Sequence, residues 1–279
     1  MQFGAITNSW RLQLEKGDLS SLVREAQSRN SKHIELRQTC LGSCETGKDE
    51  NWRPVLPNLK SVVDAFPDLS FDLAMALPCL SQRVDPLGDL FQAALEGAKL
   101  VGRNQPHLRL VDPAPAESVW ESSDDIPDVA MGLADLAKEA ARQGVTVSVE
   151  NSGQPIRSMG LLINKARLAM SENEGDFLGL CPDPTNQLRR FPGTDPLVEL
   201  EELPVDMIKI IHFKQAGDGD PHPVVDDGDL DCQKMMQLLD DKGYQGAAIM
   251  EIPPHEDVFE NLSASYNYLE GVSSGAQSP

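Results

Sequence analysis

Eight short segments of the chain are rich in β-branched and apolar residues, and a segment with helical periodicity follows each one. VTVSVE (145–150) shows the strand pattern, because apolar side chains occupy alternate positions. The other strands are expected at 2–7, 33–37, 69–75, 107–111, 177–181, 207–213 and 247–252. Helices are expected at 18–30, 55–66, 86–99, 124–143, 157–171, 195–203, 230–242 and 256–270.

The regular alternation of strand and helix predicts the fold class. Parallel strands need a crossover connection, and the helix between each pair of strands supplies it. Eight right-handed crossovers of this kind close into a (β/α)₈ TIM barrel. The alternative, an open doubly wound sheet, would carry G-x-G-x-x-G after its first strand, and GAITNSW (4–10) lacks this motif. We therefore expect one α/β TIM-barrel domain over 1–271 and a flexible tail over 272–279.

Length and charge fit this fold and exclude some partners. The chain has 279 residues, which suits a single α/β barrel. Its 44 acidic and 24 basic residues give a net charge of −20, and such a surface repels nucleic acid. No apolar run approaches the roughly 18 residues of a membrane span, and MQFGAITNSW (1–10) lacks the pattern of a secretory signal. We expect a cytoplasmic protein without nucleic-acid or membrane partners, and a homo-oligomer is left open.

The five cysteines are expected to be reduced packing residues. The spacing of Cys40 and Cys44 could suit a zinc or redox pair. No second pair and no histidine follows at zinc-finger distance, so packing is the preferred interpretation.

Polar residues stand at the carboxyl ends of the last four predicted strands, where TIM barrels place their active sites. These residues are Glu150, Asp183, His212 and Glu251. Each has an ordinary role of its own, such as a solvated loop acid, a turn before proline or a hydrogen-bonded core histidine. Together they are harder to account for, because three carboxylates at one rim would repel one another without a cation. The sequence therefore predicts a metal centre made by these four side chains.

The donor set of this predicted centre decides which metals suit it. Three carboxylates and one imidazole make a mixed and fairly hard set of ligands. We expect one divalent ion, Mn²⁺ first, with Mg²⁺, Co²⁺, Zn²⁺ and Fe²⁺ as alternatives.

Five motifs together are similar to those of a known family: VSVEN (147–151), CPDPTN (181–186), IIHFKQ (210–215), PVVDDGDLD (223–231) and AIMEIPP (248–254). With them, residues 1 to about 271 resemble the xylose isomerase-like TIM-barrel superfamily. Its sugar and sugar-phosphate isomerases and epimerases include hydroxypyruvate isomerase and tagatose 3-epimerase. The resemblance implies one divalent ion on the four rim side chains. It also implies that Glu150 and Glu251 face each other across the substrate as catalytic bases.

Two positions depart from the family pattern. Asn186 stands where the family often has histidine, and Gln215 stands where it commonly has aspartate. Both changes leave the sugar and the reaction open.

The resemblance implies a divalent-metal-dependent isomerase or epimerase of a small carbohydrate, a keto-sugar or a related oxo-sugar. Proton transfer would pass through a metal-stabilised enediolate. A metal-dependent lyase, a decarboxylase or dehydratase of an oxo-sugar acid, begins in the same way and is the alternative. A non-catalytic sugar-binding barrel is the third class, against which the two opposed glutamates argue. The related endonuclease IV needs a three-zinc cluster, which five histidines and an acidic surface do not suit.

Four further residues are candidates for substrate contact: Glu35, Arg109, Asn186 and Lys214. Glu35 and Arg109 lie on the second and fourth predicted strands, where an ion pair inside the barrel is the alternative. Lys214 lies two positions after the predicted histidine ligand and so points to the same side. Asn186 is expected either to contact substrate or to support a metal ligand. His107 shares a face with Arg109 and is a weaker candidate.

Overall fold

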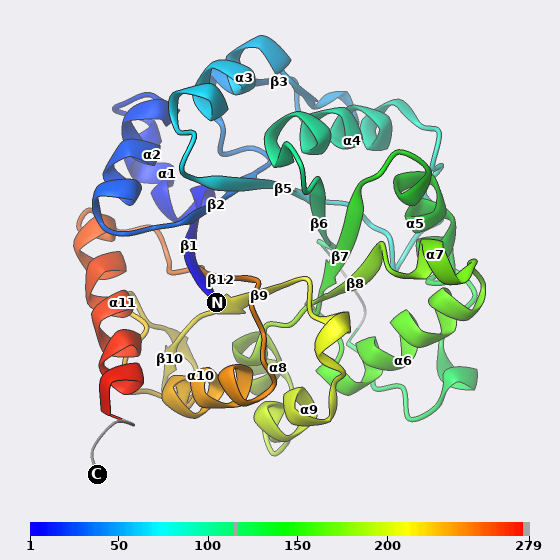
Figure 1. The fold of residues 1–279 in the computed structure, drawn as a ribbon. Helices are drawn as coiled ribbons and strands as arrows, with labels where there is room; N and C mark the ends of the chain where they lie inside the picture. The colour runs from blue at the N-terminus through cyan, green and yellow to red at the C-terminus, as the bar shows by residue number, and fades with distance from the viewer. Residues whose placement is uncertain (114–116, 276–279) are drawn as a thin grey trace.

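The computed structural model describes residues 1–113 and 117–275, and it confirms the predicted TIM barrel (Figure 1). Eight parallel strands form the wall in the order β8-β7-β6-β5-β2-β1-β12-β9. Their bounds are β1 Gln2–Ile6, β2 His33–Arg37, β5 Ser70–Ala76, β6 His107–Val111, β7 Thr146–Glu150, β8 Leu178–Cys181, β9 Ile210–Phe213 and β12 Ala247–Met250. A parallel bridge between Leu180 and Ile208 joins the two ends of this order, so the sheet nearly closes.

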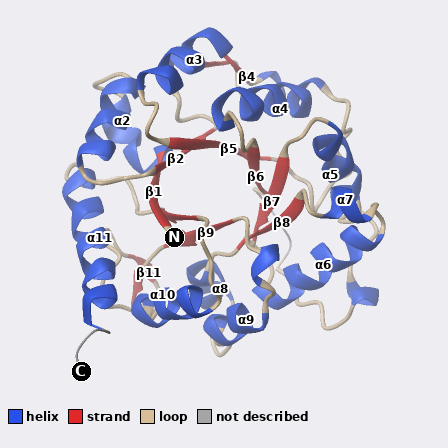
Figure 2. Cartoon of the chain, viewed as in Figure 1, coloured by secondary structure: helices blue, strands red, loops and turns tan. Residues whose placement is uncertain are grey.

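A ring of helices surrounds the strands (Figure 2). The ring consists mainly of α2 Leu19–Ser28, α3 Leu56–Ala65, α4 Asp89–Gly102, α5 Gly132–Arg142, α6 Ile156–Leu168, α9 Pro196–Glu202, α10 Cys232–Asp241 and α11 Val258–Gly275. Short helices and strands add to the loops: α1 Arg11–Leu14, α7 Glu172–Gly175, α8 Pro184–Arg190, β3 Glu45–Thr46, β4 Arg53–Pro54, β10 Ala216–Gly217 and β11 Asp220–Pro221. None of the described helices has both the length and the apolar character needed to cross a bilayer.

The interior of the barrel is apolar on one side and polar on the other. On the side of β1, β8, β9 and β12, a small cluster fills it with Ile6, Cys181, Ile210 and Ile249. On the side of β2, β5, β6 and β7, the buried side chains include Glu35, Asp72, Arg109 and Ser148. Barrel interiors are normally filled with branched apolar residues, and buried polar groups need partners. The polar half therefore requires a hydrogen-bonded network, and this network supports the site described below.

Several predicted elements differ from the structure in their bounds, and three of them bear on the fold. The helix predicted over 124–143 is not continuous, because residues Ser123–Asp125 form a 3₁₀ turn and α5 begins only at Gly132. Pro127 explains the break, since the residue before a proline avoids the helical conformation. The strand predicted at 207–213 begins at Ile210, after a 3₁₀ turn over Val205–Met207. The last helix continues to Gly275, and residues 276–279 of the predicted tail lie outside the described residues.

The five cysteines are free and buried, as predicted. Cys181 packs in the apolar half of the barrel interior.

Candidate metal centre

The four rim side chains converge at the carboxyl end of the barrel. Glu150 ends β7, His212 lies in β9, and Asp183 and Glu251 follow β8 and β12. One ligand atom from each residue lies within 4.8 Å of the ligand atoms of the others. Three of the residues are buried and Glu251 is half-buried. We call these four residues the metal cluster.

Asparagine residues hold Asp183 and Glu251, the two carboxylates that follow strands. Asn8 Nδ2 donates to Glu251 Oε1 at 2.7 Å. Asp183 is the N-cap of α8, and its Oδ1 accepts from the Asn186 backbone N–H at 2.9 Å. Asn151 accepts from the Asp183 backbone N–H at 2.6 Å and donates to its carbonyl at 3.0 Å. One oxygen of each carboxylate is thereby fixed, and the other faces the centre of the metal cluster.

Two of these asparagines are not among the residues that the sequence alone predicts for the site. Asn8 and Asn151 each come directly after a predicted strand, at the end of the barrel where the site lies. A polar side chain at that position is the signal that would have found them.

Glu35 and Arg109 support the metal cluster from inside the barrel. Arg109 Nε donates to Glu35 Oε1 at 2.6 Å, and Arg109 Nη1 lies 2.9 Å from Glu150 Oε2. The ion pair that is the alternative to substrate contact therefore forms, and both residues are almost fully buried. We call Glu35 and Arg109 the supporting pair.

The supporting pair also orients the histidine ligand. His212 Nε2 lies 2.8 Å from Glu35 Oε2. Because an ionised carboxylate can only accept, this contact assigns a proton to Nε2 and directs Nδ1 toward the metal cluster. Nδ1 lies 2.8 Å from Glu251 Oε2, and two lone pairs repel at that distance unless a proton or a cation lies between them.

Three buried atoms meet at the centre of the metal cluster. They are Asp183 Oδ2, His212 Nδ1 and Glu251 Oε2. They face one another and the Lys214 ammonium group, so carboxylate oxygens and an imidazole nitrogen converge on a single buried point. A divalent cation fits this set of carboxylate oxygens and imidazole nitrogen. The cluster is thus a candidate buried metal site.

Lys214 points into the metal cluster, as its spacing from the histidine ligand predicts. Its Nζ lies 2.6 Å from Asp183 Oδ2, 2.8 Å from Glu251 Oε2 and 3.5 Å from Glu150 Oε1. Burial lowers the pKa of Lys214, but the carboxylates of Asp183 and Glu251 outweigh it and hold this pKa well above its ordinary value. The ammonium group therefore offsets one of the three carboxylate charges.

The surroundings shift the pKa values of the three carboxylates of the metal cluster in different directions. Burial raises the pKa of Glu150, but Lys214 and Arg109 outweigh it and bring this pKa below its ordinary value. The pKa of Glu251 lies well below its ordinary value, because Lys214 again outweighs burial. Burial dominates at Asp183 and raises its pKa. Glu150 and Glu251 are thus held ionised at neutral pH, as a proton acceptor must be.

A cavity of about 190 Å³ opens at the metal cluster. Asn8, Asn186, Lys214 and Glu251 are among the residues that line it. Asn186 also donates from Nδ2 to Glu150 Oε1 at 2.9 Å, so it supports a ligand while facing the cavity.

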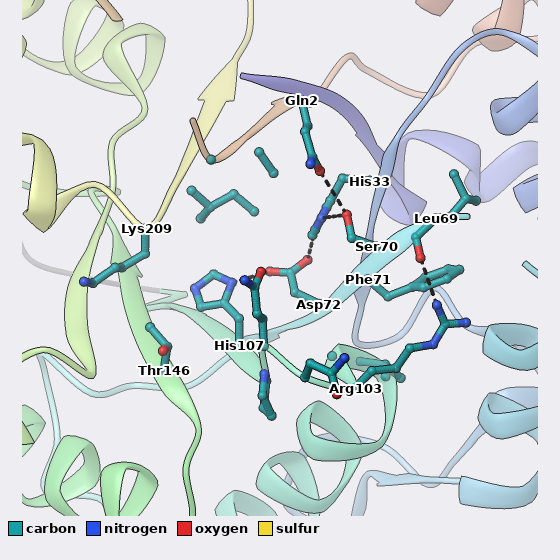
Figure 3. Close-up of a pocket in the computed structure, with 18 of the residues that line it drawn as sticks. Gln2, His33, Leu69, Ser70, Phe71, Asp72, Arg103, His107, Thr146 and Lys209 are labelled. Carbon is teal, nitrogen blue, oxygen red and sulfur yellow. Dashed lines mark hydrogen bonds and ion pairs between the residues drawn. The ribbon is translucent and has the colours of Figure 1, made fainter. Parts of the chain in front are cut away.

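A larger cavity, of about 690 Å³, lies at the opposite, amino end of the barrel (Figure 3). Asp72 lies there between two histidines, 2.9 Å from His33 Nε2 and 2.8 Å from His107 Nδ1. The remaining ring nitrogens each lie 2.8 Å from a serine hydroxyl, that of Ser70 or Ser148. Burial raises the pKa of Asp72, but the hydrogen bonds from His107 and His33 outweigh it and hold this pKa far below its usual range. All four ring nitrogens of these two histidines are thus engaged, and His107 lies at the opposite end of the barrel from the metal cluster.

Comparison with known proteins places the chain in a family. Residues 83–270, more than half of the chain, match the family model described as xylose isomerase-like TIM barrel. The protein belongs to the xylose isomerase-like TIM-barrel family. No curated protein sequence matches the chain.

Solved structures share the fold at low sequence identity. An IolI protein with a bound zinc atom matches with a TM-score of 0.70 and 16% identity, over 100% of both chains. The probable 3-DHS dehydratase AsbF of Bacillus anthracis, involved in petrobactin synthesis, matches with a TM-score of 0.71 and 14% identity, over 97% of this chain and 99% of that one. An L-ribulose 3-epimerase matches with a TM-score of 0.62 and 14% identity, over 99% of this chain and 97% of that one. An epimerase and a probable dehydratase are thus both among the structural neighbours.

Proposed function

We propose that the protein is a divalent-metal-dependent isomerase or epimerase that moves a proton within a small keto-sugar or related oxo-sugar. The observation that carries this proposal is the convergence of three carboxylates and one imidazole at one buried point beside a cavity. A divalent ion bound there would polarise a substrate carbonyl and stabilise the negative charge that develops when a carbon-bound proton leaves. We propose Mn²⁺, with Mg²⁺, Co²⁺, Zn²⁺ and Fe²⁺ as alternatives, and the zinc of the IolI structure keeps Zn²⁺ among them.

Glu150 and Glu251 are the proposed acid–base residues. Glu150 ends β7 and Glu251 follows β12, and these strands are not neighbours in the barrel, so the two carboxylates reach the metal cluster from different strands. If one removes a proton and the other returns it on the opposite face, the carbon centre is inverted, which is epimerisation. If the same carboxylate returns the proton to the adjacent carbon, aldose and ketose interconvert. Lys214 and Asn186 are proposed to donate hydrogen bonds to substrate oxygens.

The second candidate is a lyase that acts on an oxo-sugar acid. Its first step, removal of a carbon-bound proton, would use the same carboxylates, and loss of water or CO₂ would follow. The structural similarity to a probable dehydratase favours keeping this candidate.

Incubation of the Mn²⁺-loaded protein with candidate sugars in D₂O distinguishes these reactions. Solvent deuterium in a recovered isomer would support isomerisation or epimerisation. Loss of water or CO₂ would support the lyase, and the absence of exchange with every ligand would support a binding protein.

Glu150→Gln and Glu251→Gln test the proposed bases. Each substitution keeps the shape of the side chain but removes the proton acceptor, so turnover should fall by about 10²–10⁴-fold. Circular dichroism and thermal unfolding check that both variants keep the fold. Activity close to that of the wild type in both variants would end the assignment.

A further inference from the structure

A serine, a histidine and an aspartate form a line of hydrogen bonds at the amino end of the barrel, on the cavity of about 690 Å³. Ser70 and His33 are the first residues of β5 and β2, and the parallel pairing sets them side by side. Asp72 comes two positions after Ser70, so its side chain lies on the same face of β5. Figure 3 shows the three side chains together at the wall of the cavity.

The positions of the protons follow from these contacts. Burial raises the pKa of Asp72, but the hydrogen bonds from two histidines outweigh it, so Asp72 is ionised and only accepts. His33 Nε2, 2.9 Å from Asp72 Oδ1, therefore carries a proton. In the neutral imidazole Nδ1 then accepts, and Ser70 Oγ donates to it at 2.8 Å. This contact of Ser70 Oγ is shorter than those with the Lys32 carbonyl, 3.1 Å, and Gln2 Oε1, 3.3 Å.

A serine becomes nucleophilic in such an arrangement. The imidazole takes the hydroxyl proton, while the carboxylate holds the imidazole in one tautomer and stabilises the imidazolium. In serine hydrolases the hydroxyl usually contacts Nε2 and the carboxylate contacts Nδ1. The two nitrogens of His33 exchange these places, but either nitrogen accepts a proton when a carboxylate holds the proton of the other. We call Ser70, His33 and Asp72 the amino-end triad.

A second serine makes equivalent contacts on the other side of Asp72 and serves as an internal comparison. His107 Nδ1 lies 2.8 Å from Asp72 Oδ2, and His107 Nε2 lies 2.8 Å from Ser148 Oγ. Ser148 is completely buried inside the barrel, so no substrate reaches it. Ser70 is exposed and lines the cavity. Of the two serines, only Ser70 combines the activating contacts with access to a ligand.

The cavity offers space for a small ester beside Ser70. Its volume of about 690 Å³ lies in the range of ligand pockets. Its wall combines apolar side chains such as Phe177 with polar ones such as Gln245. Gln2 also lines it and carries a side-chain amide 3.3 Å from Ser70 Oγ. An amide N–H group is a donor of the kind that stabilises an oxyanion.

We infer that the amino-end triad gives the protein a second activity, the hydrolysis of small carboxylic esters, separate from the proposed reaction at the metal cluster. Ser70 Oγ attacks the ester carbonyl carbon, its proton passes to His33 Nδ1, and Gln2 Nε2 donates to the oxyanion. The carbon–oxygen bond to the alcohol breaks, and the alcohol leaves with the proton from His33. Water then gives a proton to His33 and attacks the acyl-serine. The carboxylic acid is released, and the proton returns to Ser70 Oγ.

Hydrolysis of p-nitrophenyl acetate and p-nitrophenyl butyrate by the full chain, treated with EDTA, measures this activity. His33→Gln removes the base and should lower kcat/KM by about 10²–10⁴-fold, and Ser70→Ala should lower it by at least as much. Ser148→Ala is the matched control, because it removes the equivalent but enclosed hydroxyl, and it should leave kcat/KM unchanged. Thermal unfolding verifies that each variant is folded.

Covalent labelling identifies the nucleophile. Diisopropyl fluorophosphate reacts with an activated serine, forming an oxygen–phosphorus bond and releasing fluoride. Mass spectrometry of peptides should find the label on Ser70 in the wild type and in Ser148→Ala. Label on Ser70 at an undiminished rate in His33→Gln would contradict the role of the histidine as base, and label only at other residues would refute the inference.

The outcomes separate this inference from the proposed function. If Ser70→Ala hydrolyses the esters as the wild type does, or if Ser148→Ala loses as much activity, the amino-end triad is not an ester-hydrolysing site. Hydrolysis no faster than in buffer would refute the inference as well, and sugar exchange in D₂O at the metal cluster would be unaffected by that result. Ser70-dependent hydrolysis by a protein that exchanges no deuterium into any sugar would overturn the isomerase and leave the amino-end triad standing.

Discussion

Glu35 holds His212 in one orientation and at the same time binds Arg109. Glu35→Gln should therefore weaken Mn²⁺ binding by about 10- to 100-fold, because the hydrogen-bond partner of a histidine ligand fixes its orientation. Loss of one member of a buried ion pair should also lower the free energy of unfolding by about 3–5 kcal/mol. Calorimetric titration with Mn²⁺ and urea unfolding measure the two effects. The control is Glu25→Gln on α2, which removes a solvent-accessible ion pair with Arg29 and should change Mn²⁺ affinity and stability little. Wild-type Mn²⁺ affinity in Glu35→Gln would contradict the orienting role.

Asp72 should make folding stability depend on pH. Its pKa is depressed in the folded protein, so its contribution is present above the ordinary aspartate pKa and is lost as the pH falls below it. At pH 7, Asp72→Asn should lower the free energy of unfolding by about 1–3 kcal/mol, because two histidines lose a charged partner. Below about pH 4 the difference between variant and wild type should shrink. Urea unfolding from pH 7 to pH 3 measures it, and a difference that grows on acidification would contradict this account.

The metal cluster is predictable from the sequence because each member stands at the same end of a strand, and the fold alone brings the four ends together. The residues that hold the members of the cluster in place are not predictable in this way. Glu35 and His212 are 177 residues apart, and Asn8 and Glu251 are 243 apart. Strand alternation tells which side Glu35 faces, but the tilt of the strands decides which side chain on the far wall it meets.

Among the elements, β8 passes close to the chain that leads into β9, and Gly179 permits this approach. A Cβ atom at Gly179 would lie 2.4 Å from the Met207 carbonyl oxygen. Gly179→Ala should therefore displace β8, lower the free energy of unfolding by about 1–3 kcal/mol and weaken Mn²⁺ binding through the shifted Asp183.

Gly160→Ala is the matched control for this prediction. Gly160 lies inside α6, and its added Cβ would meet only the flexible Leu203 side chain, at 3.3 Å. Helix propensity favours alanine there, so stability should stay within about 1 kcal/mol of the wild type. Urea unfolding compares the two variants, and equal effects would show that backbone crowding at β8 is not the cause.

Some helices and strands are predictable from the sequence and others are not. The eight strands follow from their runs of β-branched and apolar residues. The seven residues of α8, PTNQLRR, carry no apolar stripe, so the sequence does not predict this helix. From the sequence, its N-cap Asp183 can be interpreted either as a turn residue or as a metal ligand. In the structure Oδ1 caps α8, while Oδ2 faces the other side chains of the metal cluster, so the position of one side chain is compatible with both interpretations.

For the whole molecule, the acidic charge and the buried carboxylates predict that a divalent ion stabilises the fold. The net charge is −20, and three carboxylates lie together at the end of the barrel. A ligand that binds only the folded state adds about 2.7 kcal/mol of stability at a concentration of 100 times its Kd. Thermal unfolding with Mn²⁺, and again with EDTA, should show this gain and its reversal, whereas NaCl at equal ionic strength should give much less.

Asp183→Asn distinguishes ion binding at the metal cluster from general screening of the acidic surface. Asparagine is as good an N-cap as aspartate, so α8 should keep its start and the fold should persist. The atom that replaces Oδ2 becomes part of an amide and carries no charge, so the cluster loses a ligand. The stabilisation by Mn²⁺ should then largely disappear, while the response to NaCl stays the same. If Mn²⁺ stabilises Asp183→Asn as strongly as the wild type, the ion acts elsewhere on the acidic surface, and the metal cluster is not its site.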